Sequence, residues 1–83
     1  MIEIMISEEI HPNLGMTSSA SKLWEEINKQ NIKKIIIDFS NVIMMSFTFA
    51  REYLFQKSLS DKIVIEKNMP KIVQETFDYI QKN

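Results

Sequence analysis

Apolar positions along the chain follow two kinds of pattern: a longer, helical period, and alternation or short unbroken runs, which mark three candidate strands. These are residues 1–6, where isoleucines alternate with other residues, and the apolar runs within 33–39 and 62–66. The middle segment contains three consecutive isoleucines, Ile35–Ile37. Such a run is typical of a strand that is covered on both faces in a parallel sheet.

The longer period predicts three amphipathic helices that alternate with these strands. Each follows a residue able to cap a helix: one of Thr17–Ser19 for the first, Ser46 for the second, which should end near Ser60, and Asn68 with Pro70 for the third. The buried stripes are expected at Ala20, Leu23, Trp24 and Ile27, then at Phe49, Ala50, Tyr53 and Leu54, and finally at Ile72, Val73, Phe77 and Ile80.

The element order is therefore β-α-β-α-β-α, within one domain that spans residues 1–83. Helical crossovers between successive strands indicate an α/β fold with a small, mainly parallel three-stranded sheet. We expect helices on both faces of that sheet. Residues 7–16 contain Pro12, Asn13 and Gly15 and are expected to form a loop.

Composition excludes several classes of function. The ten basic and eleven acidic residues are interspersed, whereas a nucleic-acid reader usually shows a basic stripe. No apolar run approaches the roughly 20 residues of a membrane span, and Glu3 stands where a signal peptide carries basic charge. Cysteine is absent, so disulfides and thiolate chemistry are excluded. We therefore expect a cytoplasmic protein that binds neither nucleic acid nor membrane.

Sites for cofactors and metals are not indicated either. His11 is the only histidine, and its spacing from Glu8 and Glu9 matches no metal-ligand pattern, which favours an exposed loop histidine. Gly15 is the only glycine, whereas phosphate-binding loops need several. We expect no cofactor, no metal and no catalytic activity.

Two features leave alternatives open. Asp38 ends the central strand, where α/β sheets place ligands, but an aspartate there also caps a turn with Ser40 or Asn41. The segment Val42–Phe49 is apolar although it links a strand to a helix. Its side chains, Met44, Met45 and Phe47 among them, either form an adaptable binding patch or fill the core of a small protein.

The residues from Ile35 to Val42, followed by Ser46 to Glu52, resemble a STAS-like domain, a family similar to bacterial anti-sigma factor antagonists. Thr48, Phe49, Ala50 and Glu52 match the family's Ser/Thr-Phe-Ala-x-Glu helix start. The resemblance implies a strand order of 2-1-3, with the first strand in the centre. It also implies a serine, phosphorylated by a partner kinase, at the start of the second helix. Phe47 stands at that serine's position here, which leaves Thr48 and Ser46 as the nearby hydroxyls.

The resemblance implies a regulatory protein-interaction module whose partner is a kinase-type ATPase or an anti-sigma-like regulator. The candidate phosphorylation sites are Thr48, followed by Ser46. The candidate partner-binding residues are Asp38, Met44, Met45, Phe47 and Arg51. Two alternatives are a structural or accessory subunit that self-associates without a phospho-switch, and a fragment that lends Asp38 or Thr48 to a site completed by another chain. We also expect a homodimer, because the edge of the Ile35–Ile37 strand would be open in the implied order.

Overall fold

A computed structural model describes residues 2–82 and contains two parallel sheets and four helices within those residues. The larger sheet consists of β1 (Ile2–Met5), β3 (Lys34–Asp38) and β5 (Ile63–Lys67). A smaller one pairs β2 (Asn13–Leu14) with β4 (Met44–Met45). The helices are α1 (Ile6–Glu9), α2 (Thr17–Lys29), α3 (Phe47–Leu59) and α4 (Lys71–Lys82). The α/β class and the parallel three-stranded sheet are confirmed.

The order of the larger sheet is β1-β3-β5, so the expected 2-1-3 order is wrong. The Ile35–Ile37 strand is central, and it pairs with β1 on one side and β5 on the other. The unbroken isoleucine run therefore belongs to the most enclosed strand, whereas the alternating first strand lies at an edge. The open edge from which we expected a homodimer does not exist at this strand, and the dimer no longer follows from that argument.

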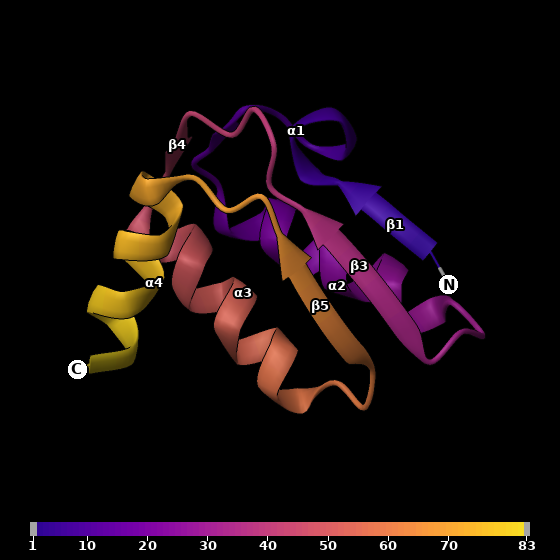
Figure 1. Cartoon of the computed structure of the whole chain (residues 1–83). Helices are drawn as coiled ribbons and strands as arrows, with labels where there is room; N and C mark the ends of the chain where they lie inside the picture. Colours follow the sequence, from indigo (N-terminus) through magenta and orange to yellow (C-terminus); the bar gives the residue numbers. More distant parts are fainter. Residues whose placement is uncertain (1, 83) are drawn as a thin grey trace.

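Helices α2 and α3 lie on the same face of this sheet, so the expectation of helices on both faces is also wrong (Figure 1). Each crossover adds the next strand on the same side, and right-handed crossovers in one direction bring both helices to one face. Helix α4 lies beside α3 rather than over the sheet (Figure 1). On the uncovered face Ile63 is 51% exposed and Ile65 is 41% exposed. The Lys67 Nζ and Glu3 Oε2 atoms pair across that face at 2.8 Å.

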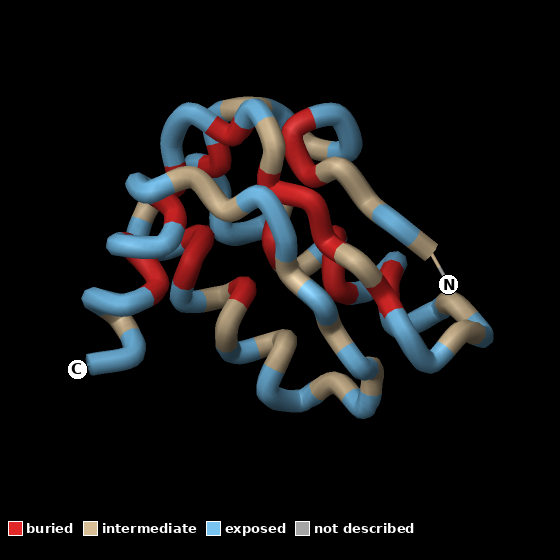
Figure 2. Tube along the Cα trace, viewed as in Figure 1, coloured by how far each residue is buried: buried red, intermediate tan, exposed pale blue. Residues whose placement is uncertain are grey.

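The core lies between the sheet and the helices, along the red segments of Figure 2. Ile35 and Ile37 supply its sheet side, and the expected stripe of α2 is buried throughout. Aromatic rings fill the region where α2, α3, α4 and the end of β3 meet. The ring of Tyr53 lies 5.4 Å from that of Trp24, 5.9 Å from Phe39 and 5.2 Å from Phe77.

Several local expectations need correction. Residues 7–16 are not only a loop, since they contain most of α1 and all of β2. Asn68 does not cap α4, which begins at Lys71; it adopts a left-handed φ of 54° instead. On α4, Ile72 is 48% exposed and Thr76 is buried, so the apolar stripe is narrower than the sequence suggested.

Candidate interaction surface

The short strand β4 decides which side chains of the apolar segment reach the surface. It pairs with β2, so Met44 lies opposite Asn13 and Met45 lies opposite Leu14. Successive strand residues point to opposite sides, and here Leu14 and Met45 enter the core while Asn13 and Met44 face outward. Met44 is 53% exposed, whereas Met45 is buried. Met45, one of the expected partner-binding residues, therefore fills the core, whereas Met44 remains exposed.

Ser46 fixes the start of α3 immediately after β4. Its side-chain oxygen accepts a hydrogen bond from the Phe49 backbone N–H at 3.0 Å and donates one to the Gly15 carbonyl at 3.0 Å. The Ser46 backbone N–H also donates to the Leu14 carbonyl at 2.8 Å. The expected N-cap is confirmed, and it ties the helix to the neighbouring strand as well.

Thr48 lies in the first turn of α3 and is exposed. Its Oγ1 atom is 3.1 Å from the Ser46 Oγ atom. Ser46 has one hydroxyl hydrogen and directs it to Gly15, so Thr48 is the donor in this pair. Arg51, one turn further on, is exposed and has no ion-pair partner among residues 2–82. An exposed hydroxyl and an exposed cation thus lie three residues apart near the positive end of the helix dipole.

Phe47 opens α3 and is 53% exposed. Its ring stacks on the ring of Tyr79 from α4, with centroids 5.2 Å apart and planes 30° apart. Tyr79 was not among the predicted site residues. The one sequence signal for its exposure is its position outside the predicted buried stripe of α4. We name the exposed set Ile43, Met44, Phe47, Thr48 and Arg51 the β4–α3 surface.

Asp38 does not belong to this surface, because it is buried with 5% of its area exposed. Its Oδ1 atom accepts hydrogen bonds from the Ser40 hydroxyl at 2.7 Å, the Ser40 backbone N–H at 2.9 Å and the Asn68 amide at 3.1 Å. The two bonds from Ser40 hold the pKa of Asp38 below its ordinary value, with smaller help from Asn68 and the Lys67 charge. Asp38 therefore performs the turn-capping role that the sequence left open.

Glu52, which matches the helix-start motif, has a half-buried side chain that bonds to neighbouring side chains. Its Oε2 atom accepts hydrogen bonds from the Ser21 hydroxyl of α2 at 3.0 Å and from the Gln56 amide at 2.7 Å. This glutamate helps to hold α2 against α3. His11 acts locally as well, since its Nδ1 atom accepts a hydrogen bond from the Asn13 backbone N–H at 2.9 Å.

Within residues 2–82 no group of histidine, cysteine, aspartate or glutamate side chains is arranged to hold a metal ion. In the same part of the chain, none of the helices has the length and apolar character needed to cross a membrane. Comparisons with family models, curated proteins and solved structures gave no match.

Proposed function

We propose that this chain is a regulatory protein-interaction module and that its partner contacts the β4–α3 surface. The observation that carries the proposal is the exposure of Met44 and Phe47, each 53% exposed, on a helix start fixed by the Ser46 cap. Methionine side chains adapt to a partner, and both methionine and aromatic residues are enriched at protein interfaces. A rigid scaffold beneath them limits the ordering entropy that binding must overcome.

Arg51 and Thr48 give the surface its polar part. The Arg51 guanidinium has no ion-pair partner within residues 2–82, and Thr48 adds an exposed, uncharged hydroxyl. A guanidinium beside an apolar centre is typical of an interface hot spot. The resemblance to STAS-like domains supports the same proposal and adds its finer terms, a kinase-type ATPase or anti-sigma-like partner and a phospho-switch at Thr48.

A comparative capture experiment tests the proposal. The tagged protein, its Phe47→Ser variant and its Phe55→Ser variant are each incubated with extract from the source cells, and the bound proteins are quantified by mass spectrometry. Phe55 is 56% exposed on the same helix, so it is a matched control. We expect at least one protein to bind the wild type and Phe55→Ser but not Phe47→Ser. If every captured protein binds all three equally, the proposed surface is refuted.

A second candidate, a structural subunit that self-associates, is favoured by a different observation. Ile63 and Ile65 are exposed on the sheet face opposite the helices, where a second copy could cover them. Sedimentation velocity separates the two candidates, since only this one predicts a dimer that Ile65→Lys converts to monomer.

A further inference from the structure

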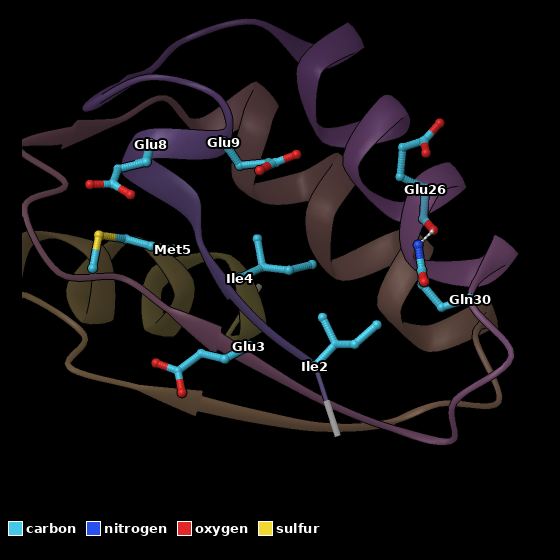
Figure 3. A pocket seen from close by; sticks show the side chains of 8 residues that line it. All are labelled: Ile2, Glu3, Ile4, Met5, Glu8, Glu9, Glu26 and Gln30. Carbon is cyan, nitrogen blue, oxygen red and sulfur yellow. Dashed lines mark hydrogen bonds between the residues drawn. The ribbon is translucent and has the colours of Figure 1, made fainter.

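The outer edge of β1 is a second place where the molecule can bind a partner. β1 pairs only with β3 within the described chain, so its other side carries backbone N–H and C=O groups with no strand beside them. A groove of about 600 Å³ follows this edge (Figure 3). All four residues of β1 line it, and because neighbouring side chains point to opposite faces, the groove follows the backbone itself.

The walls of the groove come from two helices. Glu26 of α2 and Gln30, which directly follows that helix, form one wall; Glu8 and Glu9 of α1 lie beyond the end of β1 and point to opposite sides of it (Figure 3). A smaller hollow of about 220 Å³ adjoins it on the helix side of the sheet. Ile4, Ile10 and Leu23 give this hollow an apolar lining, and Glu9 and Glu26 belong to both cavities. An extended chain placed along β1 would therefore find an apolar recess for one side chain.

The charge of the groove selects the occupant. Its lining contains four glutamates and no cation. Glu3 pairs with Lys67 and Glu26 pairs with Lys29, while Glu8 and Glu9 have no ion-pair partner among residues 2–82. Lys22 borders the smaller hollow and is the only lysine or arginine of either lining. The unpaired charge is negative and is concentrated at the end of β1.

We propose that the edge of β1 binds an extended, basic segment of a partner protein by strand addition. Backbone hydrogen bonds to β1 supply the part of the affinity that does not depend on the sequence of the segment, as in other strand-addition complexes. An aliphatic side chain enters the recess beside Ile4 and Leu23, and lysine or arginine residues meet Glu8 and Glu9. A second copy of this chain fits the edge poorly, because its own β1 edge carries the same glutamates and offers no cation to meet Glu8 and Glu9. This site is separate from the β4–α3 surface, and either can fail without the other.

The test uses an acetylated and amidated probe peptide, Lys-Val-Lys-Ile-Lys-Val-Lys, titrated into the ¹⁵N-labelled protein at low salt. We expect amide shift changes concentrated in residues 2–10 and in the facing residues 19–30, with slower hydrogen exchange of the β1 amides. A peptide with glutamate at each lysine position should bind at least about ten-fold more weakly. So should the basic peptide with alternate backbone nitrogens methylated, because it cannot pair as a strand.

Charge variants complete the test. The double change Glu8→Lys with Glu9→Lys should weaken binding of the basic probe at least about ten-fold. The double change Glu75→Lys with Asp78→Lys, at exposed positions of α4, is the control for overall charge and should leave binding within about two-fold. Shift changes confined to residues outside 2–10 and 19–30, equal binding of the methylated peptide, or a dimer that pairs through β1 would each overturn the proposal.

Discussion

The Tyr53 hydroxyl donates a hydrogen bond of 2.5 Å to the Glu66 carboxylate, and this bond joins α3 to β5. The other oxygen of Glu66 accepts from Lys57 Nζ at 3.0 Å. The tyrosine ring is fully buried among the core aromatics. Burial raises the pKa of Tyr53 well above its ordinary value, and the charge of Glu66 adds to the effect.

Tyr53→Phe should therefore change how stability depends on alkaline pH. Above a pH of about 10 the unfolded chain releases the tyrosine proton while the folded protein retains it, so folding stability falls as pH rises. The phenylalanine variant lacks this decline. At neutral pH it should be less stable by about 2 kcal/mol, because a buried bond to a charged group is lost. Urea denaturation at neutral pH and at a pH above about 10 measures both effects on the free energy of unfolding.

Tyr79→Phe is the matched control for that experiment, since it leaves the Tyr53–Glu66 bond in place. It should retain the wild-type alkaline decline. An equal decline in Tyr53→Phe and the wild type would show that the Tyr53 hydroxyl is not buried beside Glu66 in solution.

Asp38→Asn should change the acid limb of the stability curve. The pKa of Asp38 is lowered by the bonds from Ser40, so its contribution is present above the unfolded value of about 3.9 and is lost as pH falls through the folded pKa. The variant should have a lower free energy of unfolding at neutral pH, and this free energy should fall less on acidification than that of the wild type. Asp78→Asn leaves the Ser40 bonds intact and should behave like the wild type in urea denaturation. A variant whose acid limb parallels that of the wild type would disprove the role of Asp38.

Ser46→Ala tests the cap that fixes the β4–α3 surface. It removes the bonds to Phe49 and Gly15 and should lower the free energy of unfolding by about 1 kcal/mol. Thr48→Ala removes an exposed hydroxyl and its solvent-accessible hydrogen bond to Ser46, and should change stability by less than about 0.5 kcal/mol. Both values are read from urea denaturation at neutral pH. Equal losses in the two variants would show that Ser46 has no special role.

Three of the four described helices could be predicted from sequence, whereas α1, with four residues, is too short to carry a periodic signal. The stripe of α2 and the cap at Ser46 are local properties, and the structure confirms them; the stripe of α3 is buried at Phe49, Ala50 and Tyr53 but only partly at Leu54. Strand order is different, since it depends on which edges meet in three dimensions. The alternation in residues 2–5 did contain the answer: an edge strand with one side near solvent alternates, whereas the central Ile35–Ile37 strand does not.

The candidate surface could be predicted in part. The excess of apolar residues in 42–49 indicated that some would stay exposed, and Met44 and Phe47 do. Which of them face outward depends on the pairing of β4 with β2, two strands of two residues each, which are too short to give a sequence pattern. The groove along β1 was not predicted, because it is formed by residues from three elements that the chain brings together only on folding.

The phospho-switch at Thr48 remains a prediction. Ser46 already uses its hydroxyl in the cap, whereas Thr48 is exposed in the first turn with Arg51 three residues on. Thr48→Glu should fold normally by circular dichroism and should alter capture of the partner relative to Thr48→Ala. Thr17→Glu places the same charge at the start of α2 and should have no effect. Wild-type capture by both Thr48 variants, with no phosphate on the native protein by mass spectrometry, would refute the switch.

Site-specific photo-crosslinking tests the interaction module most directly. Benzoylphenylalanine replaces Phe47 in one protein and Phe55 in another, two positions of similar exposure on α3. After irradiation in the source cells, the adducts are identified by mass spectrometry. We predict that position 47 yields an adduct with a specific second protein and that position 55 does not. Equal labelling from both positions, or adducts of the chain with itself alone, would contradict a partner-binding role for the β4–α3 surface.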